Sequence, residues 1–167
     1  MSYPEPLYHG ETGVISATLE PANRAPELTY PSGGTVHYLA TGESTSGQFG
    51  LYRWEMAAAQ GGPQPHFHRS ISESFYVLSG RIGLYDGARW IDGRPGDFLF
   101  VPEGGIHAFR NESGAPAAML ISADGRRPPD VRRREDCVLS ASRHVLDLRM
   151  HLGLTATPRG VLFQLVN

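Results

Sequence analysis

The chain has 167 residues, 40% of them hydrophobic, and a formal net charge of −2 at neutral pH. This length is enough for one domain with a core of its own, and so small a charge gives no reason to expect a nucleic-acid partner. No apolar run reaches the roughly 18 residues that a membrane-spanning helix requires, and the first residues do not resemble a secretory signal. We therefore expect a cytoplasmic protein with no membrane partner.

Two residue types are rare or missing, and this excludes several kinds of site. Cys137 is the only cysteine, which excludes a disulfide within the chain and a zinc-ribbon site. We interpret it as a small structural residue. All fifteen basic residues are arginine. Without lysine, neither Schiff-base catalysis nor a phosphate-loop lysine is available to this chain.

The first third of the chain predicts an extended arm followed by a pair of strands. Residues 1–34 are polar and dotted with proline, and we interpret them as an N-terminal arm that lies on the body or on a partner subunit, with a short strand at 13–19. Aromatic and β-branched residues predict strands at 35–40 and 48–57. The glycine-, serine- and threonine-rich segment between them predicts a hairpin loop.

The rest of the chain continues the same pattern, with short apolar runs bounded by glycine and proline, which is typical of an all-β protein. Strands are expected within 73–80, 81–87, 88–113 and 117–123. We predict that 74–87 forms a β-hairpin with Gly80 at its bend, because glycine tolerates the backbone conformation of a tight turn. Residues 126–136 predict a charged, solvated loop. After it, leucine or methionine stands at every second position from 146 to 154, which predicts a strand that pairs with 160–167.

Two segments contain histidines at characteristic spacing. The first reads His-x-His-x4-Glu-x6-Gly from His66 to Gly80, and the second reads Gly-x5-Pro-x-Gly-x2-His-x3-Asn from Gly96 to Asn111. Side chains at i and i+2 of a strand share a face, so both histidines of the first segment can point inward. Its glutamate can reach the same point from the next strand, and a tight Pro-Gly turn can deliver the histidine of the second segment.

Three imidazoles and one carboxylate would then converge on one place. That donor set suits one divalent transition metal ion (Fe, Mn, Ni, Co, Cu or Zn), and it lacks the thiolates of a structural zinc site. The predicted metal ligands are His66, His68, Glu73 and His107.

Together the two segments resemble the two motifs of the cupin superfamily, so the chain is similar to a single-domain cupin. One departure is Gln60, which holds the place where the first motif usually opens with glycine. The resemblance implies an all-β double-stranded β-helix, or jelly-roll barrel, over residues 35–125. The N-terminal arm at 1–34 would precede this core, and a C-terminal β extension at 126–167 would follow it.

Residues 35–123 are similar to the bacterial quercetin 2,3-dioxygenase-like branch of the cupins. This similarity implies a metal-dependent dioxygenase that uses O2 to cleave a flavonol-like or other small enolic or phenolic substrate. Glu73 would then be both a metal ligand and the general base. Two alternatives stay open: a Lewis-acid isomerase, cyclase or decarboxylase with the same ligands, or a small-molecule-binding cupin without catalysis.

Strand alternation also suggests the walls of a substrate pocket. If Glu73 points inward, so do Phe75 and Val77, and if His107 points inward, so does Phe109. These residues either line a pocket for a flat apolar substrate or belong to the core.

A second alternating stripe lies at 52, 54 and 56, where Tyr, Trp and Met alternate with charged residues. This stripe could line the mouth of the cavity or a subunit contact, and alternation alone leaves open which set faces inward. The resemblance to small cupins further predicts a homodimer that exchanges the N-terminal arm or the C-terminal hairpin.

Overall fold

The computed structural model describes residues 5–125, and every regular element within them is a β-strand. The strands are β1 (Leu28–Thr29), β2 (Thr35–Ala40), β3 (Phe49–Met56), β4 (Ile71–Ser79), β5 (Ile82–Tyr85), β6 (Trp90–Gly93), β7 (Phe98–Val101), β8 (Ala108–Arg110) and β9 (Ala117–Gly125). The predicted all-β class is therefore confirmed. Residues 5–125 contain no helix that is long and apolar enough to cross a membrane.

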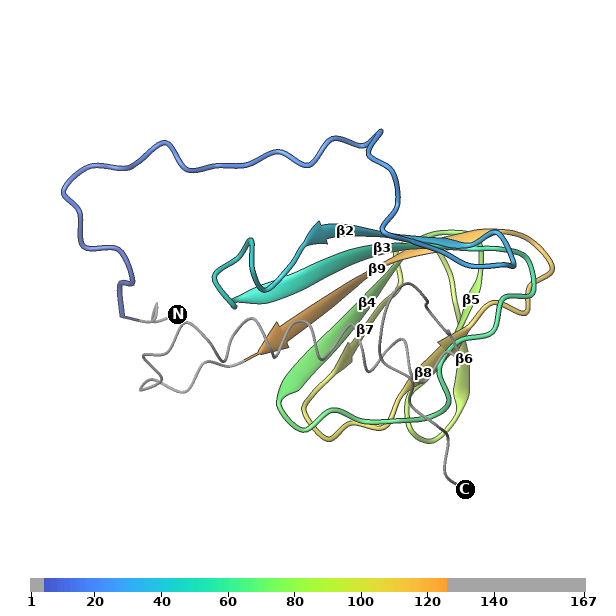
Figure 1. Ribbon diagram of the computed structural model, residues 1–167. Helices are drawn as coiled ribbons and strands as arrows, with labels where there is room; N and C mark the ends of the chain where they lie inside the picture. The colour runs from blue at the N-terminus through green and yellow to red at the C-terminus, as the bar shows by residue number, and fades with distance from the viewer. Residues whose placement is uncertain (1–4, 126–167) are drawn as a thin grey trace, which may run out of the picture.

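The strands form two antiparallel sheets (Figure 1). One has six strands in the order β1-β2-β3-β9-β4-β7, and the other has three in the order β6-β5-β8. Ile82 and Leu84 of the smaller sheet are buried in the same cluster as Phe75 and Met119 of the larger one, so the two sheets share one core. This arrangement is the predicted jelly-roll barrel.

The burial pattern of β3 shows which set of its alternating side chains faces inward. Tyr52, Trp54 and Met56 are buried and face the core, whereas Arg53 and Glu55 on the same strand lie on the outer face. The same alternation runs through β4 and β9, whose buried residues line up with those of β3 across the sheet. The sheet therefore has an apolar inner face and a mixed outer face.

The predicted hairpin over residues 74–87 is wrong. β4 pairs with β7 and β9, while β5 pairs with β6 and β8, so the two consecutive strands belong to different sheets. Gly80 marks the corner between them, with φ at +72°. A Cβ at this position would lie 2.6 Å from the carbonyl oxygen of Pro116, so close backbone packing as well as the turn requires glycine.

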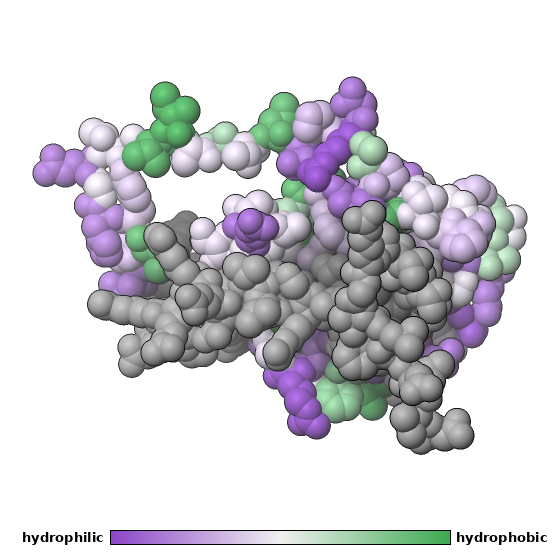
Figure 2. Space-filling model, in the orientation of Figure 1, coloured by the Kyte–Doolittle hydropathy of each residue, from purple (hydrophilic) through white to green (hydrophobic). Residues whose placement is uncertain are grey.

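The N-terminal arm differs from its expected form. Residues 5–25 are exposed along their length, and the strand expected at 13–19 is not formed. In Figure 1 the arm loops away from the barrel, and Figure 2 shows apolar side chains exposed along it. The chain joins the sheet only at β1, where Leu28 pairs with Val36. The strands expected after residue 125 lie outside the described residues.

Candidate metal centre

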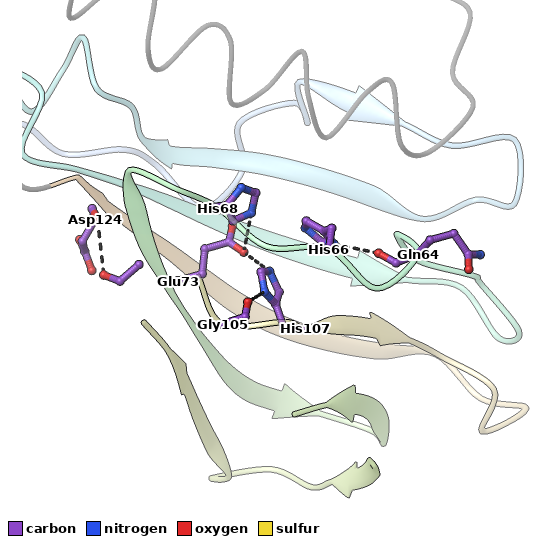
Figure 3. Close-up of polar contacts among 8 residues, drawn as sticks. Gln64, His66, His68, Glu73, Gly105, His107 and Asp124 are labelled. Atoms are coloured by element: carbon purple, nitrogen blue, oxygen red, sulfur yellow. Dashed lines mark hydrogen bonds and ion pairs between the residues drawn. The ribbon is translucent and has the colours of Figure 1, made fainter. Parts of the chain in front are cut away.

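The structure brings the four predicted ligands together (Figure 3). One donor atom from each of His66, His68, Glu73 and His107 lies within 4.8 Å of all the others. The first two come from the segment before β4, Glu73 from β4 itself, and His107 from the residue before β8. Bonds of about 2.0–2.2 Å to one ion place neighbouring donors about 3 Å apart, so a cluster of this size fits a single ion.

His66 and His107 are joined through their backbones. The amide N–H of His66 donates to the His107 carbonyl at 3.0 Å, and the His107 amide donates back to the His66 carbonyl at 2.9 Å. Directly opposed residues of such a bridge project to one face, and the two ring centroids lie 4.4 Å apart. The expected strand around the first two histidines is reduced to this one bridge. Alternation still holds there, because Phe67 between them is 46% exposed.

The turn before His107 is tied to the segment that carries His68. The amide of Gly104 donates to the His68 carbonyl at 2.7 Å, and the amide of Gly105 donates to the Pro102 carbonyl at 2.9 Å. Gly104 has φ at +82°, a conformation that favours glycine. The predicted Pro-Gly turn is present, and it positions His107 relative to His68 through the backbone.

Backbone carbonyls orient two of the rings. His66 Nδ1 lies 2.8 Å from the Gln64 carbonyl oxygen, and His107 Nδ1 lies 3.0 Å from the Gly105 carbonyl oxygen. Because a carbonyl only accepts, each Nδ1 must carry the proton, which leaves Nε2 of both rings as the ligand atom. Contacts of this kind fix the tautomer and orientation of metal-binding histidines.

Glu73 is the centre of the cluster. Its carboxylate is 4% exposed, and its Oε2 accepts a hydrogen bond from His107 Nε2 at 2.7 Å and lies 3.3 Å from His68 Nε2. Burial alone would lower the pKa of His107, but its hydrogen bonds to Glu73 and Gly105 and the carboxylate charge together raise it. Burial lowers the pKa of His66, and its hydrogen bond to Gln64 offsets only part of that effect.

The Glu73 carboxylate thus favours a proton on Nε2 of His107. A metal cation bound at the centre would take the place of this proton, because it would use the same Nε2 lone pair. Three imidazole nitrogens and one carboxylate oxygen form a donor set for a divalent transition metal. In two of the imidazoles, those of His66 and His107, the Nδ1 proton is already hydrogen-bonded to a backbone carbonyl. The residues present therefore fit such an ion.

Asn111 of the second motif, four residues after His107, forms hydrogen bonds to two neighbouring loops. The residue is fully buried, and its Nδ2 donates to the carbonyls of Ala57 at 2.9 Å and Ala115 at 2.8 Å. Its Oδ1 accepts from the Ser113 hydroxyl at 2.7 Å, and its own amide donates to the Gln60 carbonyl at 2.8 Å. The sequence pattern singled out this asparagine without a role, and the structure shows that it joins the loop after β3 to the loop after β8.

The three residues suggested as pocket walls do not lie equally near the centre. The ring centroid of Phe75 lies 5.7 Å from that of His107, so this side chain borders the site. Phe109 packs against Phe75 and Trp54 at centroid distances of 5.8 and 5.0 Å, and Val77 is fully buried. All three belong to the core cluster, and a pocket role for them stays a prediction.

The sequence indicated Tyr52 only as part of a stripe that could line the cavity mouth or a subunit contact, and the structure buries it on the same inner face as Glu73. The pKa of Tyr52 is raised to about 12, first by burial and then by the charges of Tyr38 and Glu73. The signal was present in the Tyr-Trp-Met stripe, but the direction that the stripe faces could be decided only by the pairing of β3 with β2 and β9.

Comparison with known proteins assigns the family. A family model described as "Cupin domain" matches residues 52–122, which contain all four clustered ligands. Residues 52–122 therefore form a cupin domain. The chain is 31% identical over 111 residues to quercetin 2,3-dioxygenase of Bacillus subtilis, a match that covers 63% of the chain but only 31% of that enzyme. It is 34% identical over 65 residues to an uncharacterized protein of Aquifex aeolicus, covering 37% of the chain and 54% of that protein.

Solved structures agree on the fold. A crystal structure described as a predicted oxalate decarboxylase from Thermotoga maritima superimposes with a TM-score of 0.57, covering 66% of this protein and all of that chain. The sequence identity is 18%, so this likeness concerns the fold alone.

Proposed function

We propose that this protein is a metal-dependent dioxygenase that uses O2 and acts on a small enolic or phenolic substrate of the flavonol type. The proposal rests on one observation, the convergence of three imidazoles and the Glu73 carboxylate within 4.8 Å. The similarity to quercetin 2,3-dioxygenase supports the choice of substrate class and of O2, because the matched segment is 31% identical over 111 residues.

In this proposal His66, His68, Glu73 and His107 hold one divalent transition metal ion. When bound, the ion supplies positive charge and open coordination positions that favour an enolate or phenolate oxygen over the neutral hydroxyl. Gln64 and Gly105 keep two of the imidazoles oriented through their carbonyls. Phe75 gives the apolar border against which a flat ring can pack.

Glu73 also acts as the general base. Its Oε2 lies among the imidazole nitrogens, so a substrate hydroxyl that enters the site meets this carboxylate. The proton passes from that hydroxyl to the carboxylate, and the substrate oxygen becomes anionic.

The test combines metal analysis with oxygen uptake. Elemental analysis of purified protein is expected to find about one transition metal ion per chain, and a panel of flavonols is expected to include one that drives oxygen uptake. The Glu73→Gln variant should lose about 10²–10⁴-fold in turnover, the range for loss of a general base. Glu55→Gln on the outer face of β3 is the matched control and should keep full activity.

Two outcomes contradict the proposal in different ways. Turnover that is unchanged without oxygen would rule out dioxygenation and favour the Lewis-acid isomerase, cyclase or decarboxylase, which uses the same ligands. A purified chain that takes up none of the candidate transition ions would remove the metal-dependent function altogether.

A further inference from the structure

A row of small side chains runs from Glu73 across the inner face of the larger sheet. Glu73 on β4 is directly opposite Ala123 on β9, and Ala123 is directly opposite Gly50 on β3. Residues opposed in this way project to the same face of an antiparallel sheet. Across the inner face from Glu73, therefore, the first neighbour is the methyl group of Ala123, and the second is Gly50, which has no side chain.

The hydroxyl of Tyr52 occupies the far end of this row. A Cβ built on Gly50 would lie 2.6 Å from the Tyr52 hydroxyl oxygen and 2.9 Å from two carbons of its ring. The tyrosine thus leans along β3 over Gly50, and a side chain at position 50 would displace it. Because position 50 is glycine, the Tyr52 side chain can extend along β3 as far as the row of residues that contains Gly50, Ala123 and Glu73.

The Tyr52 residue is 4% exposed, and only burial and the charges of Tyr38 and Glu73 act on its phenol, with no hydrogen bond to it among residues 5–125. Its ring is held by the edge-on ring of Tyr38, with centroids 5.2 Å apart. A phenol hydroxyl that makes no hydrogen bond to the protein is available to donate one to a ligand. The pKa of about 12 keeps the phenol protonated, so it can donate a hydrogen bond at neutral pH.

We propose that Tyr52 is a second anchoring point for the substrate, donating a hydrogen bond to an oxygen remote from the one held at the metal centre, while the body of the substrate lies over Ala123. The inference rests on the function proposed above and makes it more specific. The backbones of Glu73 and Gly50 are two strand spacings apart, about 10 Å. The substrate is therefore a planar oxygenated compound of more than one ring, with acceptor oxygens on separated rings.

Binding measurements test this inference without depending on turnover. Quercetin is the probe, with the one-ring compound catechol as the short comparison, and both are titrated anaerobically into metal-loaded protein by calorimetry. Tyr52→Phe should weaken quercetin binding about tenfold, the effect of one lost hydrogen bond, and should leave catechol binding unchanged. Tyr76→Phe, on the outer face of β4, is the matched control and should change neither affinity.

A second pair of variants tests the space over Ala123. Ala123→Leu places a larger side chain between the carboxylate and the phenol, and should weaken quercetin binding at least tenfold while metal content stays that of the wild type. Ala118→Leu on the outer face of the same strand should have no effect on binding. Circular dichroism checks that all variants are folded.

The outcomes separate this inference from the proposed function. Equal quercetin affinity in the wild type, Tyr52→Phe and Ala123→Leu overturns the anchoring role even if oxygen uptake is observed. Selective loss of quercetin binding supports it even if no oxygen is consumed. A wild-type protein that binds catechol as tightly as quercetin, or binds neither, also overturns it.

Discussion

The inner and outer faces of the larger sheet carry similar residue types in different roles. On β4, Glu73 and Phe75 point inward and form the candidate centre and its border, while Tyr76 is 43% exposed on the other face. On β7, Phe98 and Phe100 are 63% and 58% exposed. Neighbouring positions on a strand therefore differ in role: one aromatic ring borders the site, and the next one along the strand faces outward.

The same contrast applies to charge. Glu55 on the outer face pairs with Arg53 at 3.2 Å, but the carboxylate is about half exposed, and exposed pairs of this kind contribute little. Glu73 is buried among imidazoles, where it raises the pKa of His107 against the opposing effect of burial. Of these two carboxylates, the one on the inner face has the stronger electrostatic effect on its partners, because little water screens it.

The largest expected difference between the faces is in stability. Phe75→Ala removes a fully buried ring from the core and should lower the free energy of unfolding by about 3–5 kcal/mol. Phe100→Ala on the outer face should change it by no more than about 0.5 kcal/mol. Urea denaturation of both variants measures this directly. Equal losses would mean that the outer face is covered in solution.

A smaller expected effect is the pH dependence of metal binding. A proton on His107 Nε2 excludes a metal, and the pKa of this ring is raised, so metal affinity should fall as pH is lowered through that pKa. The fall should be up to about tenfold per pH unit for each proton displaced. The pKa of His66 is lowered, so protonation of this ring adds to the dependence only at lower pH than protonation of His107.

The measurement is a competitive titration with a metal chelator between pH 5.5 and 8.5. His37→Ala provides the matched control, because His37 on β2 is directly opposite Arg53 on the outer face of the sheet and should not affect either the affinity or its slope. Metal affinity that does not vary over this range would contradict the assignment of His107 as a ligand.

The smallest expected effect on stability comes from the N-terminal arm, which tests the homodimer predicted from the sequence. Ile15 and Leu19 of the arm are almost completely exposed, so Ile15→Asp with Leu19→Asp should leave the unfolding free energy of the barrel nearly unchanged. If a second copy of the chain covers the arm, the same pair of changes should shift the mass in solution from dimer to monomer. Light scattering measures that mass, and a monomeric wild type would contradict the predicted homodimer.

The candidate site could be predicted from the sequence because its ligands lie in short segments of regular spacing. His66 and His68 are two residues apart, and alternation in an extended chain keeps them on one side even where only a single bridge forms. The Pro-Gly turn before His107 is also set locally, since the Gly105–Pro102 hydrogen bond and the positive φ of Gly104 depend on neighbouring residues. Local geometry of this kind can be inferred from the order of residue types.

Contacts between distant segments could not be predicted in the same way. Gly80 signalled a sharp bend, but the bend joins two sheets instead of two strands of a hairpin, because β4 pairs with β9 from much later in the chain. Likewise, the Tyr-Trp-Met stripe of β3 could have faced either side until its partners in β2 and β9 were known. Strand pairing over long sequence separation follows from packing of the whole core.

The order of amino acids was thus sufficient to indicate an all-β chain and the identity of four candidate ligands, since both depend on spacing along one strand or turn. Their convergence within 4.8 Å, and the placement of Tyr52 and Ala123 beside Glu73, arise from the folded barrel. The physical reason is that a side chain's own strand sets its direction, whereas its neighbours across the sheet are set by which strands pair and in which register.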